Sequence, residues 1–244
     1  WTTPDMAAVC TGFVLRQPED DVRLSGDTKA PVRLALANGD QIVCRAVHFD
    51  QGRSIDHALL NGPGVMLRPA RGREDEEPEL AILLAEGGIL PEGDRISWSD
   101  TADAELARRG DAGAGDGGDE EMLLRSAVFT GRVELMQVRT GDFVRCEKLD
   151  VAMGETRNDA GEPDAYPEKV TATGRVRARQ EGSDIEADEL TIEFAEGPPP
   201  DEPEDAVDPP RFHPTSLDAK GAVRLTEAGD RPVTATAGTL LADL

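Results

Sequence analysis

The side chains best suited to acid–base or nucleophilic chemistry in this sequence are its histidines, His48, His57 and His213. A catalytic histidine needs a nucleophile or a carboxylate within hydrogen-bond reach. None of the three stands in a sequence arrangement that suggests such a dyad or triad. We therefore expect the histidines to be incidental and the protein not to be an enzyme. The enzymatic alternative is a parallel β-helix lyase, which also has repeated short strands.

An aspartate-rich segment, Asp111–Glu120, offers carboxylates that could bind Ca²⁺. Its Asp111, Asp116 and Asp119 lack the regular odd-position spacing of an EF-hand loop, so we interpret the segment as a solvated loop. No Cys/His pair has the spacing of a zinc site, and the sequence has no Gly-Lys-Ser/Thr signature of a phosphate-binding loop. The sequence therefore predicts no metal and no cofactor.

The three cysteines are too few for a disulfide scaffold. Cys44 and Cys146 occupy equivalent positions in two repeats that lie two hairpins apart. If the hairpins stack in order, four strand spacings or roughly 19 Å separate them, whereas a disulfide needs Cα atoms within about 7 Å. We expect both to be small buried apolar residues that do not bond to each other. The pairing of Cys10 is left open.

Acidic residues far outnumber basic ones: 49 Asp and Glu against 26 Lys and Arg give a net charge of −23. Because nucleic-acid binding relies on Lys and Arg to neutralise phosphates, this charge argues against DNA or RNA as a partner. It also argues against a general attraction to anionic membranes. The sequence begins at Trp1 without a basic or apolar leader, so we expect a processed form or a segment of a longer protein.

The elements that must position any site are hairpins, and the clearest one is Val170–Phe194. In its first half small apolar residues alternate with Thr and Arg, which is the period of a strand with one buried face. Residues 180–184 supply a turn with Gly182. In the second half Ile185 and Ala187 share one face, and the next apolar residues then continue on the opposite parity. This change of parity predicts a bulge or a bend in the strand.

The same template recurs along the chain, and a repeat of this kind decides the fold. Counted from a turn glycine, apolar residues fall at offsets 3, 5, 8 and 10 in the best copies; the turn glycines are Gly39, Gly93, Gly141, Gly182 and Gly229. In the ascending strands, Gly131, Gly174 and Gly221 are each followed by apolar residues at offsets 2 and 4.

These hairpins predict an all-β fold: an elongated antiparallel repeat sheet, folded lengthwise into a V by a bend at one level, with long acidic loops. Arg132, Glu134, Arg175, Arg177, Glu186 and Asp188 should face outward. We expect a single domain over residues 1–244 with loops at 71–79, 110–120, 154–168 and 196–210. Two finer expectations are a loose strand pair within Asp20–Leu36 and about two helical turns in Asp100–Arg109.

Three units carry a family resemblance: FTGRVELMQVRTGDFVRCEKLDVAM, ATGRVRARQEGSDIEADELTIEF and NGDQIVCRAVHFDQ. They resemble the OstA-like repeats of the lipopolysaccharide transport bridge proteins, and the resemblance extends over all five hairpins. It implies a β-taco or β-jellyroll that holds acyl chains of a lipid (lipopolysaccharide or another acylated glycolipid) in a V-shaped groove. It further implies modules that join edge to edge, in the periplasm or cell envelope of a diderm bacterium.

On this interpretation the inside of the V is a lipid groove. Its expected lining is Ile42, Cys44, Val47, Phe49, Val133, Leu135, Val144, Cys146, Leu149, Val151, Ile185, Ala187, Leu190, Ile192 and Phe194. Few aromatic and many small apolar side chains would leave room for flexible chains. Two alternatives stay open: the same residues could form a dry core, and the protein could be a structural module that self-associates or assembles with neighbours through its sheet edges.

Overall fold

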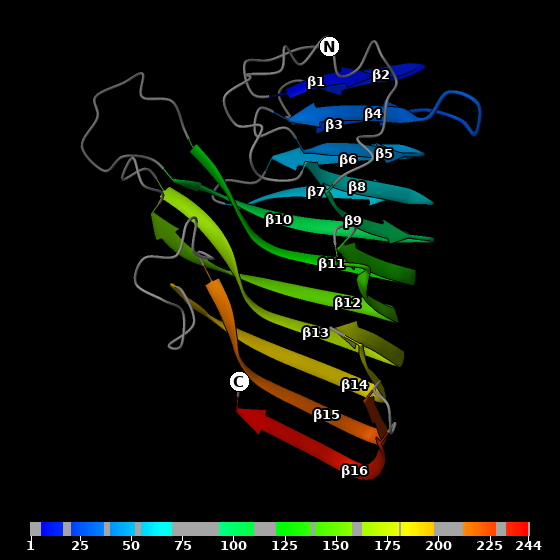
Figure 1. Ribbon diagram of the computed structural model, residues 1–244. Helices are drawn as coiled ribbons and strands as arrows, with labels where there is room; N and C mark the ends of the chain where they lie inside the picture. Colours follow the sequence, from blue (N-terminus) through cyan, green and yellow to red (C-terminus); the bar gives the residue numbers. More distant parts are fainter. Residues whose placement is uncertain are drawn as a thin grey trace.

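A computed structural model describes residues 6–16, 21–36, 40–51, 55–69, 93–109, 121–137, 140–157, 163–180, 182–197, 212–227 and 233–243. Within these ranges the chain is almost entirely β-strand and contains no helix, so the all-β prediction is confirmed. The strands form one antiparallel sheet that curls into a half-barrel (Figure 1). Figure 1 also shows the strands stacked in chain order, with the two ends of the chain at opposite ends of the stack.

Ten short strands build the N-terminal half of the sheet. Their bounds are β1 Met6–Val9, β2 Gly12–Arg16, β3 Asp21–Ser25, β4 Val32–Leu36, β5 Gln41–Cys44, β6 Ala46–Gln51, β7 Ile55–Asn61, β8 Gly64–Pro69, β9 Gly93–Trp98 and β10 Thr101–Arg109. Six longer strands follow, namely β11 Glu121–Gln137, β12 Asp142–Arg157, β13 Pro163–Gln180, β14 Ser183–Glu196, β15 Phe212–Glu227 and β16 Val233–Asp243.

The pairing divides the sheet into two walls that meet along a crease. Wall A consists of β1, β4, β5, β8 and β9, and wall B of β2, β3, β6, β7 and β10. Strand β11 pairs with β9 through its C-terminal part and with β10 through its N-terminal part, so it belongs to both walls. Strands β12–β16 cross the crease in the same way. Among β11–β16 consecutive strands are antiparallel neighbours, as predicted. In the N-terminal half successive strands alternate between pairing and entering different walls.

In the N-terminal half the crease is made by interrupting each strand. Consecutive short strands such as β5 and β6, or β9 and β10, are separated by one to a few residues and enter different walls. Backbone hydrogen bonds still connect neighbouring strands at this level, namely Thr11 N–Ser25 O, Gly26 N–Arg45 O, Arg45 N–Asn61 O, Gly62 N–Asp100 O and Asp100 N–Thr130 O. The interruptions therefore turn the sheet without breaking its hydrogen-bond ladder.

In the C-terminal half the strands stay continuous and turn through β-bulges. Two residues of an ascending strand oppose one residue of its partner, for instance 174 and 175 of β13 against Asp188 of β14. The first bulge residue is a glycine with positive φ in each ascending strand: 92° at Gly131, 79° at Gly174 and 93° at Gly221. Only glycine adopts this backbone region without strain. The predicted bend is confirmed, and the extra residue that makes it lies in the ascending strand.

Three of the finer predictions were wrong. Residues 101–109 form strand β10 instead of a helix, because β10 pairs along its length with both β7 and β11. Strands β3 and β4 do not pair with each other, since they are successive pieces of one bent strand and enter different walls. The loop expected at 154–168 is mostly strand, because β12 and β13 pair as far as Arg157 and Pro163. The loops expected at 71–79, at 110–120 and over most of 196–210 lie outside the described residues.

Candidate functional site

The inside of the curled sheet is apolar along its whole described length. One continuous cluster of buried side chains runs from Ala8 to Val223 and takes residues from both walls. Deepest in it are Leu24 and Leu149 at 1% exposure and Val32 at 0%. The two walls thus turn their apolar faces toward each other, which buries more apolar surface than a flat sheet could.

The residues predicted for the groove face this interior. Those nearest the crease are buried, and the others are partly buried and pack against the same cluster. Buried are Ile42, Cys44, Val47, Val133, Cys146, Leu149, Ala187 and Leu190; partly buried and packed against them are Phe49, Leu135, Val144, Val151, Ile185 and Ile192. Phe194 is also partly buried, and its ring makes an edge contact with Phe212, with centroids 6.0 Å apart.

Burial decreases from the crease toward the rims of the two walls in the C-terminal half. On β14, Ala187 and Leu190 flank the crease at 4% and 2% exposure, whereas Ile185 and Ile192, one step further out on either side, are only partly buried. The same grading holds on β12, where Cys146 and Leu149 are buried and Val144 and Val151 are partly exposed. We call this inward apolar face, which is buried at the crease and partly exposed at its rims, the trough.

The prediction missed several residues of the interior. Trp98 is 2% exposed and lies beside Phe129, with ring centroids 5.6 Å apart. Leu24 and Leu34, in the short strands β3 and β4, are as deeply buried. The period-2 alternation of VRL in both strands was the available signal. It was hidden because each piece has only five residues and the crease interrupts the pattern.

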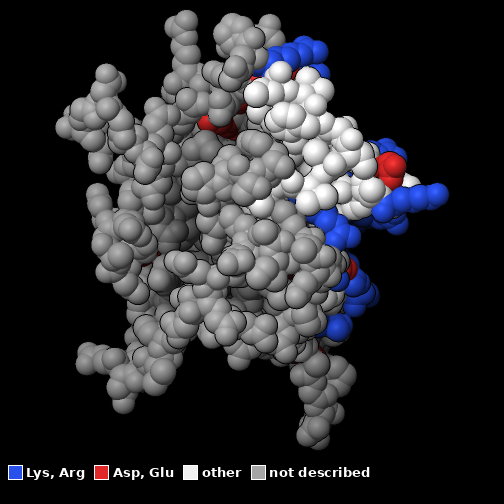
Figure 2. Space-filling view, turned by 90° about the horizontal axis from the view of Figure 1, so that it is seen from above, with Lys and Arg blue, Asp and Glu red and all other residues white. Residues whose placement is uncertain are grey.

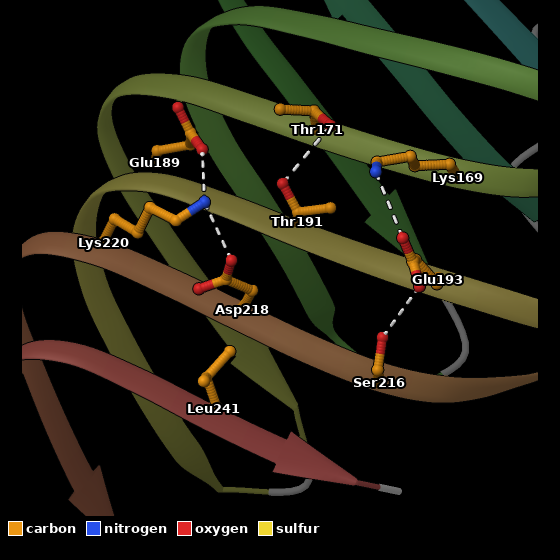
Figure 3. A pocket seen from close by; sticks show the side chains of 9 residues that line it. All are labelled: Lys169, Thr171, Glu189, Thr191, Glu193, Ser216, Asp218, Lys220 and Leu241. Carbon is orange, nitrogen blue, oxygen red and sulfur yellow. Dashed lines mark hydrogen bonds and ion pairs between the residues drawn. The ribbon is translucent and has the colours of Figure 1, made fainter.

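The outer face of wall B carries an open polar hollow of about 420 Å³ (Figure 3). It is lined by Lys169, Thr171, Glu189, Thr191, Glu193, Ser216, Asp218, Lys220 and Leu241. The hollow lies on the opposite side of the sheet from the trough, because its residues alternate along the strands with inward residues such as Leu190 and Ile192.

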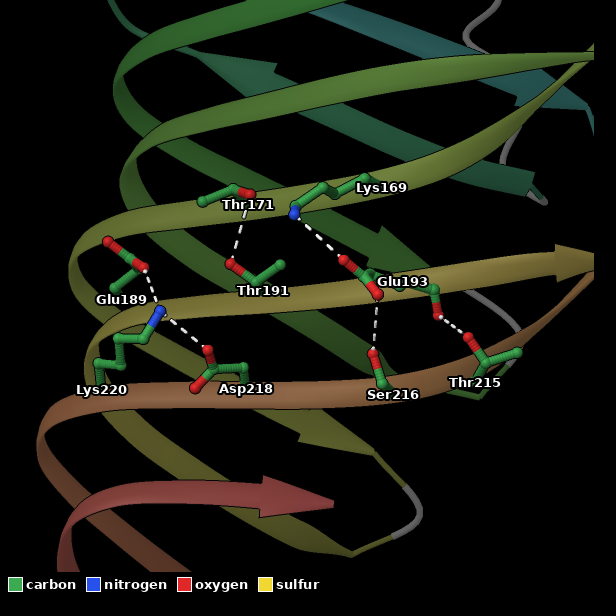
Figure 4. A network of polar contacts seen from close by, with 9 residues as sticks. All are labelled: Lys169, Thr171, Glu189, Thr191, Glu193, Thr215, Ser216, Asp218 and Lys220. Carbon is green, nitrogen blue, oxygen red and sulfur yellow. Dashed lines mark hydrogen bonds and ion pairs between the residues drawn. The ribbon is translucent and has the colours of Figure 1, made fainter. Parts of the chain in front are cut away.

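Most polar groups in this hollow contact a neighbour on the next strand (Figure 4). Lys169 Nζ lies 3.1 Å from Glu193 Oε1, and Ser216 donates to the other carboxylate oxygen at 3.3 Å. Lys220 bridges Asp218 and Glu189 at 2.8 and 3.3 Å, and hydrogen bonds to these two carboxylates raise its pKa. Apart from Lys220–Asp218, which lies within β15, these are cross-strand contacts in register, so we interpret the hollow as a ladder that stabilises β13–β15.

The three histidines lie on different strands and have different surroundings. His48 Nε2 lies 2.7 Å from Asp21 Oδ1, and Arg23 hydrogen-bonds the same carboxyl, which lowers the pKa of Asp21. His57 is exposed on β7, and His213 Nδ1 contacts the carbonyl oxygen of Gly197 at 2.8 Å. Among the described residues, no three His, Cys, Asp or Glu side chains are grouped as metal ligands would be. The segment Asp111–Glu120 lies outside these residues.

The cysteines are free thiols, and two of them belong to the interior. Cys44 in β5 and Cys146 in β12 are separated by four strand steps in wall A, as predicted. Burial raises the pKa of Cys44 to about 12 and that of Cys146 to about 11. Both side chains therefore stay neutral near pH 7 and act as small apolar residues, as expected from the sequence. Cys10 lies between β1 and β2, partly exposed.

The fold and its interior define an all-β half-barrel with an apolar trough. Comparison with known families finds no family model that matches this chain, and comparison with curated proteins finds no match. The part of the chain that the structure describes contains no helix that could span a bilayer. A function must therefore be argued from the trough and the surfaces themselves.

Proposed function

We propose that this protein is a lipid-carrying module of the cell envelope of a diderm bacterium, with acyl chains lying in the trough. The observation that carries the proposal is the graded burial in the trough. Inward apolar side chains at its rims, such as Val144, Ile185 and Ile192, are only partly covered by the protein. Partly covered apolar surface that follows a continuous channel is what flexible acyl chains would bury.

Two further features support a lipid over a small rigid ligand. The trough is lined by aliphatic and small side chains and runs across several consecutive strands, which fits a long apolar chain better than a compact ring system. The repeated hairpins also resemble OstA-like repeats, whose bridge proteins hold acyl chains between two walls of such a sheet. The resemblance makes the periplasm the expected compartment.

Lipid should co-purify with the native protein. Organic extraction should release it, and mass spectrometry of the extract will identify it. We expect Ile192→Glu to reduce the bound lipid several-fold, because it places a carboxylate on the trough wall. Thr191→Glu is the matched control, since it adds the same charge to the outer face of the same strand and should leave the lipid content unchanged. Folded protein that carries no lipid, or equal lipid loss in both variants, would contradict the proposal.

A second function, assembly through sheet edges, is favoured by a separate observation. The large apolar side chains that are well exposed lie on the outermost strands of the described sheet: Val9, Phe13, Val14, Leu15, Val233 and Leu241. Strands β1 and β2 end the sheet on one side and β16 ends it on the other. Edge strands that present apolar side chains can pair with another chain.

Assembly of this kind should appear as a mass that rises with protein concentration in size exclusion coupled to light scattering. The double variant Val233→Lys, Leu241→Lys should keep the protein monomeric, because lysine on an edge strand opposes pairing. Thr191→Lys, on an inner strand, is the control. Assembly through β16 would be ruled out by a mass that stays constant over the whole concentration range. It would also be ruled out if the mass of the double variant rose with concentration as that of the unchanged protein does.

A further inference from the structure

The outer face of wall A carries a cluster of arginines that the overall acidity of the chain does not lead one to expect. Arg95 on β9, Arg145 on β12, and Arg177 and Arg179 on β13 all point away from the trough with 37–51% of each side chain exposed. Looking down the stack of strands, Figure 2 shows Lys and Arg side chains gathered along one flank of the described surface. We call these four residues the arginine cluster.

The arginine cluster surrounds a phenylalanine. Phe143 faces outward on β12 and yet is only 8% exposed. The guanidinium carbons of Arg145, Arg179 and Arg177 lie 4.5, 5.4 and 6.0 Å from its ring centroid. The face of the ring attracts each of these three guanidiniums and limits the rotamers of their side chains. Phe143 therefore fixes the positions of three of the four arginines.

Two carboxylates are shared among the four guanidiniums. Glu134 accepts from Arg95 at 3.0 Å and from Arg145 at 2.5 Å. Asp184 accepts two hydrogen bonds from Arg179, at 2.9 and 3.0 Å, whereas Arg177 reaches it only at 3.7 Å, beyond hydrogen-bond distance. Glu186, the cross-strand partner of Arg177 on β14, lies 3.9 Å from Arg224 and is counted together with it. These five arginines against three carboxylates leave the patch at +2, and a guanidinium has five N–H donors, so donor capacity remains unused.

The register of the sheet sets two of the arginines directly against each other. Arg145 and Arg177 are cross-strand partners on β12 and β13. Like charges in directly opposite positions destabilise a sheet, and neither Glu134 nor Asp184 binds both residues. An anion held between the two guanidiniums would remove the repulsion and use their free donors.

We propose that the arginine cluster binds the phosphoryl group of a phosphomonoester between Arg145 and Arg177. A phosphomonoester carries up to two negative charges, which matches the local +2, and three oxygens that can accept from two guanidinium forks at once. A carboxylate carries only one negative charge and has two acceptor oxygens, so it matches the local charge and the two forks less well. Nucleic acid and a flat anionic membrane fit less well, because the chain as a whole has a net charge of −23. This site is independent of whether the trough holds lipid.

The test is a calorimetric titration of the purified full chain with inorganic phosphate and with glycerol phosphate at low ionic strength. Saturable binding is expected, and Arg177→Gln and Arg145→Gln should each weaken it at least about tenfold. Arg224→Gln is the matched control, because Arg224 lies on the same face two strands away and pairs with Glu186. The affinity of the Arg224→Gln variant for phosphate should change by no more than about twofold. The absence of saturable binding, or equal loss in all three variants, would overturn the proposal.

Thermal unfolding separates binding from a purely structural role. Arg177→Gln removes the repulsion from Arg145, so the unfolding temperature without phosphate should stay level or rise while phosphate affinity falls. A fall in the unfolding temperature with unchanged phosphate affinity would show that Arg177 serves the fold alone and would overturn the proposal.

Two further probes define the ligand. If the protein binds vesicles that contain phosphatidic acid through Arg177 more tightly than it binds glycerol phosphate, the phosphoryl group comes from a lipid headgroup. If it binds glycerol phosphate more tightly, the ligand is a soluble phosphomonoester. Both results support the site. Binding of a glutamate hexapeptide as tight as that of phosphate would refute the phosphoryl assignment.

Discussion

Replacing Leu190 by alanine is expected to lower the free energy of unfolding by about 2–5 kcal/mol. Leu190 is 2% exposed on the inward face of β14, next to the crease. Its partners on the two adjacent strands are Ala172 and Ala219, both buried, so no larger side chain stands beside it to fill the space. The variant would therefore lose the transfer energy of the side chain and leave a cavity that the alanines cannot close.

Ile192→Ala is the matched control for this variant. It removes a side chain of the same size from the same face of the same strand, one step nearer the rim, where the residue is only partly buried. We expect a smaller cost of about 1–2 kcal/mol, since less apolar surface leaves water there. Equilibrium urea unfolding of both variants measures the difference. Equal costs would mean that the walls close as tightly at the rim as at the crease, and the trough would then be a dry core.

The repeat pattern was enough to predict the sheet because the decisive information is local. The offsets after Gly141 and Gly182 already contain both the alternation of a strand and the change of parity at the bend. The inward face follows from these two facts alone, which is why nearly all of the predicted groove residues lie in or against the interior cluster. The local pattern also identified the glycines of the ascending strands. That these glycines are bulge residues became clear only from the pairing register of the strands.

Where the prediction failed, pairing partners overrode the local signal. The segment TADAELARR is rich in residues that favour helices, and read alone it suggests one. In the structure Ala102 is buried at 2% exposure between strands β7 and β11, and pairing on both sides fixes β10 as a strand. The polar composition of residues 154–157 and 163–168 predicts a loop, yet these residues extend β12 and β13, with Gly154 opposite Tyr166. Pairing between strands supplies hydrogen bonds that composition does not reveal.

The outward-facing clusters were beyond sequence reasoning for a related reason. Arg95 and Glu134 are 39 residues apart and meet only because β9 and β11 are adjacent in a particular register. The chain as a whole is strongly acidic, and many of its acidic residues lie in the segments between strands, such as 71–79 and 196–210. Folding nevertheless brings four arginines together on the outer face of wall A, in a protein whose net charge argues against a basic surface. The amino-acid composition of the chain gives only its total charge and does not show where on the surface the charged side chains lie.

The crease itself can be tested at one glycine, and Gly221→Ala is expected to cost about 1–3 kcal/mol. Gly221 has φ = 93°, and an added Cβ would lie 2.1–2.6 Å from side-chain atoms of Asp188. Asp188 would have to move away and give up its hydrogen bond from the Ala222 amide, which is 3.3 Å long. The backbone would also carry a side chain in a region that alanine rarely adopts.

Two other glycines separate these causes. Gly141 has φ = 76° in the β11–β12 turn with open space around its Cβ position, so Gly141→Ala should carry the backbone cost alone, about 1 kcal/mol. Gly238 lies on β16 opposite the β15 bulge, without positive φ and also in open space, and Gly238→Ala should be neutral or stabilising by about 0.4–1 kcal/mol. Chemical denaturation of the three variants gives the ranking. If Gly221→Ala were as well tolerated as Gly238→Ala, the bulge would not be what bends the strand, and the two walls would owe their angle to the packing of the interior instead.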